Sequence, residues 1–306
     1  MTSGTCPICL TDAELTREHV WPNWFLQRMD EQGAPPFGWS LNGQPLLDRR
    51  KNQIKGDKRQ RIMMPVCDHC NGEMGRRIEV PAKRVVEPLA LNNWRGRYKR
   101  EEWRAFGLWW AKVLLLIGHE ESFLENARLN KLVNLNFETK PNLQWLTDGS
   151  PVPAHVSVFV YNADFTRSGT EHELMLPAHV LFDDKTSADC HVLSMATPGL
   201  GIAVASHPGV VIEHPLVATG RAWEVLHDPP RRGDISRLKS VQRNAVWFLR
   251  GGGVPEGHVV DGSEFSWLTG IFDYQADQHP ARSRVQGSKG RLNRLLPSRW
   301  SQKDGA

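Results

Sequence analysis

The sequence predicts an α+β protein in which a small cysteine-bearing module is followed by a helical segment and a mostly antiparallel β domain. Three observations lead to this class. Two Cys-x2-Cys pairs lie near the N-terminus, a strongly apolar helical pattern occupies residues 101–118, and short β-branched and aromatic runs begin at residue 155. We therefore divide the 306 residues into a first module (1–97), an α+β domain (98–275) and a basic, flexible tail (276–306).

The first module is organised by its cysteines. Cys6 and Cys9 form one pair, and Cys67 and Cys70 form the other. Each pair is expected to fold as a tight turn, and four thiolates around one ion make a closed, structural zinc site. Paired thiolates of this kind are typical of a reducing compartment, so we expect a cytoplasmic location. No apolar run is long enough to span a bilayer, and we expect no membrane partner.

Local patterns predict the other elements of this module. Residues 16–20 should be extended and should end before Pro22, because proline donates no hydrogen bond to a strand ladder. A short helix is expected from Asn23. A longer helical stretch should run from Asn71 to about residue 91, with an interruption at Pro81.

The next residues give the clearest helix in the chain, from Glu101 to Gly118. Apolar side chains recur there at spacings of three and four, and the apolar face is too wide to remain in water. We expect a buried core helix, paired with a second helix over residues 122–133.

From residue 155 onward the predicted domain changes to a strand pattern. Strands are expected at residues 155–161, 173–182, 190–196, 201–206 and 210–214. Their turn-bounded spacing favours an antiparallel sheet, in which Cys190 is interpreted as a small buried residue. Residues 241–250 fit either a helix or a strand.

Charge is distributed unevenly along the chain. Residues 1–104 hold 18 Lys and Arg against 13 Asp and Glu, whereas residues 105–275 hold 13 against 19 and residues 276–306 hold 7 against 2. Part of the first basic zone lies in residues 31–65, which we interpret as a long insertion, turn-rich at first and then basic. The two basic zones could face a polyanion, and the alternative is an ordinary solvated surface.

Three polar residues suggest chemistry beside the cysteines. Glu18 and His19 lie between the two pairs, and Asn71 directly follows the second. Phosphodiester hydrolysis needs a base for the attacking water and a cation for the phosphate; His19 suits the first role, and the oxygens of Glu18 and Asn71 suit a Mg²⁺ ion. Because neighbouring side chains of a regular strand point to opposite faces, we expect the backbone to bend at Glu18–His19.

The order of these residues resembles a known family. Cys-x2-Cys, then Glu18-His19-x2-Pro22, then Cys-x2-Cys-Asn is similar to the HNH, or ββα-metal, endonuclease superfamily and within it to the endonuclease VII type. The resemblance covers the first 80 to 90 residues. It implies a zinc-stapled ββα-metal module with a structural zinc on the four cysteines, a catalytic Mg or Mn on Glu18 and Asn71, and His19 as base. The third motif position is Asn rather than the commoner His, and the long span leaves the middle asparagine unassigned, with Asn52 a weak candidate.

The sequence therefore predicts a metal-dependent endonuclease that hydrolyses phosphodiester bonds, with DNA as the substrate implied by the resemblance. A non-catalytic zinc module for nucleic-acid binding or protein docking is the alternative, and residues 98–275 would serve recognition or homo-oligomerisation. A third option makes the α+β domain the active part, although it contains no P-loop, nucleophile elbow or dinucleotide fingerprint. Phosphate contacts are expected from Arg17, Lys51, Lys55, Lys58, Arg59, Arg61, Arg76 and Arg77, and His69 is expected to face outward.

Overall fold

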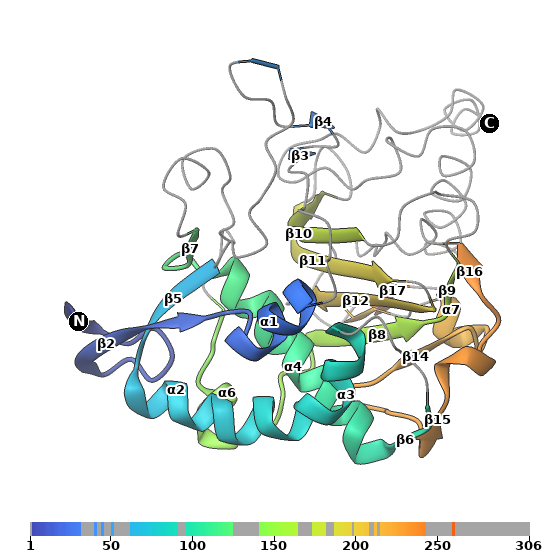
Figure 1. Cartoon of the computed structure of the whole chain (residues 1–306), viewed down its shortest axis with the longest axis horizontal. Helices are drawn as coiled ribbons and strands as arrows, with labels where there is room; N and C mark the ends of the chain where they lie inside the picture. The colour runs from blue at the N-terminus through green and yellow to red at the C-terminus, as the bar shows by residue number, and fades with distance from the viewer. Residues whose placement is uncertain are drawn as a thin grey trace.

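The computed structural model describes residues 2–31, 40–41, 44–45, 50–51, 62–90, 96–124, 141–164, 173–181, 187–197, 199–207, 211–212, 215–242 and 259–260. Helices and antiparallel sheets both occur in these ranges, so the predicted α+β class is confirmed (Figure 1). The tail 276–306 lies outside the described residues, as does most of the predicted insertion. No helix in the described ranges is long and apolar enough to cross a membrane.

The N-terminal sheet has four strands in the order β1-β2-β5-β7, and its pairs are antiparallel. Its strands are β1 (Thr2–Thr5), β2 (Asp12–His19), β5 (Ile62–Cys67) and β7 (Phe123–Leu124). The extended segment predicted at 16–20 is the end of β2. The predicted insertion ran too far, because its last residues already belong to β5, a short apolar strand buried along nearly its whole length.

Four helical elements accompany this sheet. They are α1 (Asn23–Glu31), α2 (Asp68–Met74), the π-helical turn η1 (Gly75–Glu79) and α3 (Val80–Ala90). The predicted interruption at Pro81 is wrong, since α2, η1 and α3 follow without a break. In the π turn the Val80 N–H bonds to the Gly75 carbonyl, five residues back. This shift of the hydrogen-bond ladder immediately precedes Pro81, which has no N–H to contribute.

The second large sheet has five strands in the order β10-β11-β12-β8-β14, all antiparallel. Its strands are β8 (Val156–Tyr161), β10 (Glu173–Leu181), β11 (Ser187–Thr197), β12 (Leu200–Ser206) and β14 (Ala222–Glu224). The antiparallel prediction is confirmed, and Cys190 lies in β11 as expected. The register shifts between Met175 and Ala178, around Pro177.

Short elements complete the described chain. They are β3 (Ser40–Leu41), β4 (Gln44–Pro45), β6 (Tyr98–Lys99), α6 (Trp145–Asp148), β9 (Ala163–Asp164), β13 (Val211–Ile212), α7 (Pro215–Ala218), β15 (Arg232–Gly233), the 3-10 turn η2 (Ile235–Arg237), β16 (Val241–Gln242) and β17 (Val259–Val260). The strand predicted at 210–214 pairs with β17 instead of joining the large sheet. The helix predicted at 122–133 is wrong at its start, because Phe123 and Leu124 form β7; the rest of it lies outside the described residues.

Helix α4 (Arg100–Gly118) lies at the centre of the molecule, as Figure 1 shows. It contacts α3 as well as β8 and β12, and its Trp103, Trp109 and Trp110 are fully buried. The predicted core helix is therefore confirmed. Buried residues from both sides of the predicted boundary at 97 belong to one hydrophobic core, so α4 joins the cysteine-bearing part to the large sheet.

Candidate metal centre and its surroundings

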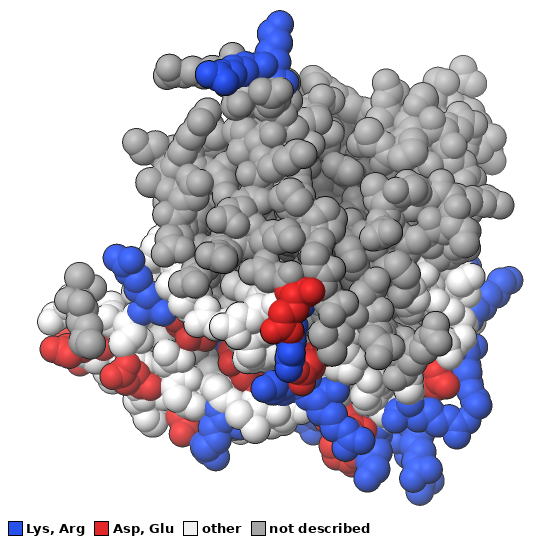
Figure 2. Space-filling view, in the orientation of Figure 1, with Lys and Arg blue, Asp and Glu red and all other residues white. Residues whose placement is uncertain are grey.

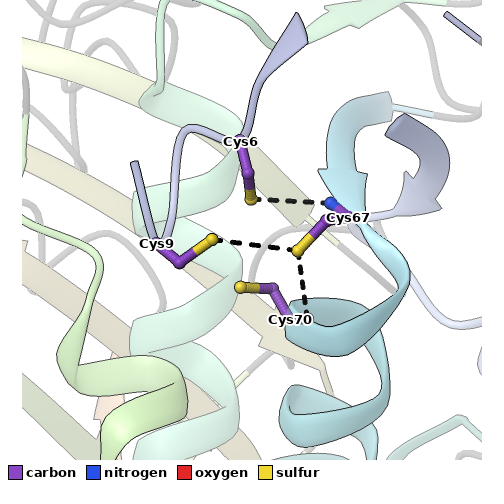
Figure 3. A group of neighbouring side chains, drawn as sticks. All are labelled: Cys6, Cys9, Cys67 and Cys70. Atoms are coloured by element: carbon purple, nitrogen blue, oxygen red, sulfur yellow. Dashed lines mark hydrogen bonds between the residues drawn. The ribbon is translucent and has the colours of Figure 1, made fainter. Parts of the chain in front are cut away.

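The four cysteines of the two pairs converge, as predicted (Figure 3). Their sulfur atoms all lie within 4.8 Å of one another, and the Sγ atoms of Cys9 and Cys67 are 3.8 Å apart. None of the four is in a disulfide, and all but Cys9 are buried. This arrangement could hold one metal ion.

Backbone geometry explains why the first pair forms a turn. Leu10 has a φ of 61°, in the left-handed region, and its side chain is exposed. The turn is closed by a hydrogen bond from Leu10 N–H to the Cys6 carbonyl (2.8 Å) and by one from Cys6 N–H to the Thr11 carbonyl (2.9 Å). Both cysteines consequently lie on one side of a loop between β1 and β2.

The second pair marks the junction of β5 and α2. Cys67 ends the strand and caps the helix, because its Sγ accepts a hydrogen bond from the Cys70 N–H (3.5 Å). The Cys67 N–H in turn points to the Cys6 sulfur at 3.5 Å. Since N–H donors favour a charged sulfur, the backbone is arranged to accept thiolates here.

The cysteine thiols differ in acidity. Burial raises the pKa of both Cys67 and Cys70. Burial also acts to raise the pKa of Cys9, but hydrogen bonds with Thr11 outweigh it and lower that pKa to about 6. A metal ion would hold its ligands as thiolates, so its binding would release the protons that burial retains.

Glu18 makes an ion pair that its sequence context does not suggest. Its Oε1 lies 3.0 Å from Nζ of Lys112, a residue of α4 that is completely buried, and the same Nζ also pairs with Oε1 of Glu79. Burial raises the pKa of Glu18, and the Lys112 charge opposes this effect. Two carboxylates around one ammonium group leave one negative charge in excess.

Glu18 and His19 occupy a regular part of β2, so the predicted bend is wrong. Their cross-strand partners are Met64 and Met63 without a register shift, and the Val20 N–H continues the ladder to the Ile62 carbonyl (3.0 Å). The two side chains therefore point to opposite faces of the sheet, and that of Glu18 faces α4. Asn71 lies half-buried on α2, which contacts β2 and β5.

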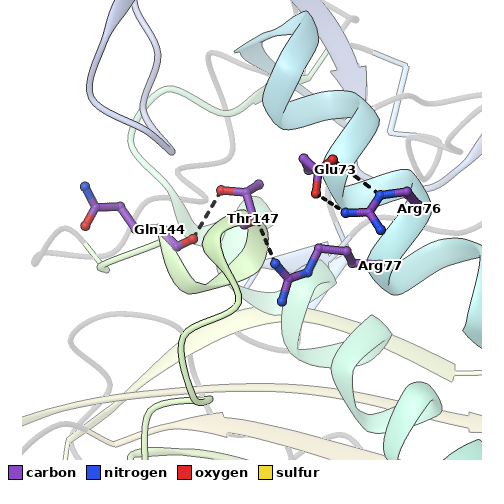
Figure 4. A network of polar contacts seen from close by, with 5 residues as sticks. All are labelled: Glu73, Arg76, Arg77, Gln144 and Thr147. Atoms are coloured by element: carbon purple, nitrogen blue, oxygen red, sulfur yellow. Dashed lines mark hydrogen bonds and ion pairs between the residues drawn. The ribbon is translucent and has the colours of Figure 1, made fainter.

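The predicted phosphate contacts have different surroundings. Arg17 and Lys51 are exposed, and so is His69, as expected. Of the two helix arginines, Arg77 is half-buried and donates from Nη1 to the Thr147 carbonyl at 2.9 Å (Figure 4). Arg76 is exposed and pairs with Glu73 at 2.6 Å. The remaining candidates, Asn52, Lys55, Lys58, Arg59 and Arg61, lie outside the described residues.

Sequence reasoning missed Lys112 and Glu79. The available signal was Lys112 itself, the single charge within the apolar run of residues 105–117. A lysine on the core face of a helix requires a partner, because an unpaired buried charge is very costly. The partner residues are distant in sequence and could not be identified from it.

No family model matches this chain, and comparisons with curated proteins and with solved structures find no significant match. The resemblance to HNH endonucleases therefore depends on the motif residues alone.

Proposed function

We propose that this protein is a metal-dependent endonuclease that hydrolyses phosphodiester bonds of DNA, built around a structural zinc ion. The convergence of the four cysteines carries the proposal. In a tetrahedral thiolate site with zinc–sulfur bonds of about 2.3 Å, neighbouring sulfurs are about 3.8 Å apart. The distance between the Cys9 and Cys67 sulfurs is 3.8 Å, so this donor set fits zinc.

The zinc ion would be structural. Four thiolates fill its coordination sphere, so the zinc would bind no water for attack on a phosphate. Its contribution would be to link the loop after β1 to the start of α2. Because Asn71 directly follows Cys70, this link would fix the position of Asn71 relative to β2, the strand that carries Glu18 and His19.

A second ion, Mg²⁺ or Mn²⁺, would use oxygen ligands from Glu18 and Asn71 and would supply positive charge to the phosphate. Lys112 engages Oε1 of Glu18 and holds its carboxylate in one orientation, and Oε2 would be the oxygen that binds the ion. The excess negative charge of the Glu18, Glu79 and Lys112 group favours a cation at this position.

His19 is the proposed general base. It would accept the proton of the attacking water at a ring nitrogen as the water oxygen bonds to phosphorus, and the bond to the leaving oxygen would break, with that oxygen taking a proton from solvent. His19 is the last residue of β2, and the proposal requires that a substrate bound at this end of the strand reach both faces of the sheet.

Cleavage of supercoiled plasmid tests the proposal. The purified chain should contain about one zinc ion and should nick plasmid in Mg²⁺ or Mn²⁺ but not in EDTA. His19→Ala should abolish nicking with the zinc content unchanged, whereas His69→Ala, which removes an exposed histidine, should nick normally. Absence of nicking by the wild type, or full nicking by His19→Ala, would overturn the endonuclease proposal.

The second candidate is a non-catalytic zinc module that binds nucleic acid or docks a protein. Two observations favour it: Glu18 is already paired with Lys112, and the regular course of β2 separates the Glu18 and His19 side chains. DNA binding in EDTA by a protein that never nicks plasmid would support this candidate over the first.

A further inference from the structure

The largest gathering of Lys and Arg in the view of Figure 2 lies over β6 and β15, away from the cysteines. We call it the β6–β15 basic surface, and it is defined by Arg97, Lys99, Arg100, Arg104, Arg231 and Arg232, all exposed. Strand β6 comes from the basic first zone of the sequence, and β15 comes from the acidic middle zone. The net charge of each zone therefore does not reveal this basic surface.

Strand alternation explains why the charges point outward. Tyr98 and Gly233 form the inward pair: Tyr98 is buried, and the Trp103 indole donates to the Gly233 carbonyl at 3.4 Å. The next pair, Lys99 and Arg232, must face the opposite side, which is solvent. The Arg100 N–H bonds to the Arg231 carbonyl at 3.2 Å and keeps the two segments together.

Stability does not account for this arrangement. Lys99 and Arg232 are directly opposed like charges, which weaken a strand pair. Arg100 and Arg104 are like charges four residues apart on α4, which is also unfavourable. Within the described part of the chain Arg100 has an ion pair, with Asp228 at 3.1 Å, but both side chains of that pair are more than half exposed. Such a pair exchanges readily with solvent or with another anion.

We infer that the β6–β15 basic surface binds the phosphate backbone of duplex nucleic acid. Backbone recognition needs closely spaced cations on a stiff support, and two paired strands joined to a 19-residue helix supply that support. A membrane surface is disfavoured, because the exposed large apolar side chains among the described residues are Leu10, Val80 and Val217, and none of these belongs to the surface.

The inference rests on the nucleic-acid substrate of the proposed function and adds a second contact area to it. Arg100 and Lys112 are twelve residues apart on α4, a separation of about 18 Å along the helix. About five base pairs of duplex span that length at 3.4 Å per pair. A duplex of ten base pairs is therefore long enough to contact both this surface and the Glu18 region.

Binding without cleavage tests the inference. The full chain is titrated in EDTA against two unrelated duplexes of about 20 base pairs at several salt concentrations. The double variant Lys99→Gln/Arg232→Gln should weaken binding of both duplexes about tenfold and reduce the slope of log affinity against log salt by about two. Its melting temperature should equal or exceed that of the wild type, since a like-charge pair is removed.

A matched control variant shows whether a loss of affinity comes from this surface or from the lower net charge of the protein. Arg28→Gln/Arg237→Gln removes two positive charges that are already paired with acidic side chains and belong to no proposed phosphate contact, and its affinity should stay close to that of the wild type. Equal affinity of Lys99→Gln/Arg232→Gln and the wild type would overturn the inference, as would equal losses in the two double variants. Binding to phosphatidylserine vesicles but not to duplex would also overturn it. If the wild type binds duplex through this surface but never nicks plasmid, the inference stands and the endonuclease proposal fails.

Discussion

Replacing Lys112 with methionine would leave Glu18 and Glu79 facing each other without a cation. Lys112 is completely buried, and the side chains of its two partners are only 12% and 17% exposed. Removing one member of a buried ion pair costs about 3–5 kcal/mol, because the remaining charge is left without compensation. The carboxylates keep some access to water, so we expect a loss of about 3 kcal/mol in the free energy of unfolding at pH 7.

Urea unfolding followed by tryptophan fluorescence measures this loss. The triple variant Lys112→Met/Glu18→Gln/Glu79→Gln should recover most of it, since a neutral group replaces the unbalanced carboxylates. Lys239→Met makes the same substitution at an exposed lysine and should change stability by less than about 0.5 kcal/mol. A loss below about 1 kcal/mol for Lys112→Met, or a triple variant no more stable than the single one, would refute the reasoning.

The loss should also depend on pH. The pKa of Glu18 is already raised by burial, and Lys112→Met removes the charge that opposes this. A carboxyl whose folded pKa exceeds its unfolded value binds more protons in the folded state, so its contribution to stability is present at low pH and is lost as pH rises through the folded pKa. The difference between Lys112→Met and wild type should therefore be smaller at pH 5 than at pH 7.

Three further predictions follow from contacts elsewhere. Zinc affinity should fall at least about tenfold per pH unit below pH 8, because burial raises the pKa of two of the four thiols. Competition with a chromophoric chelator measures this affinity, and a pH-independent affinity would contradict the prediction. Arg77→Ala should lower the free energy of unfolding by about 1–2 kcal/mol, because the Thr147 carbonyl loses its hydrogen bond, and should leave duplex affinity unchanged. Alanine at the exposed neighbour Arg76 should leave stability nearly unchanged. Gly201→Ala would place a methyl group 1.8 Å from the Tyr161 ring and should cost at least about 3 kcal/mol in urea unfolding; near wild-type stability would show that β8 and β12 can separate locally.

Much of the fold could be predicted from local pattern. The α4 helix was predicted to within one residue at its start, because its apolar spacing is long and regular. The strands of the large sheet were located by alternation between turn residues. Errors occurred at short elements such as β5 and β7, where pairing with distant residues overrides local preference. They also occurred at Pro81, where the π turn directly before it lets the helix continue.

The sequence by itself determined the candidate metal centre, since two Cys-x2-Cys pairs specify both the donor atoms and the turns that present them. The tertiary structure alone decided the surroundings of that centre. Glu18 and Glu79 meet Lys112 because α4 packs against the N-terminal sheet and η1, and Lys99 meets Arg232 because β6 pairs with β15. Contacts between residues that are 33 to 133 positions apart depend on how whole elements pack, and the local pattern of a single sequence does not predict that packing.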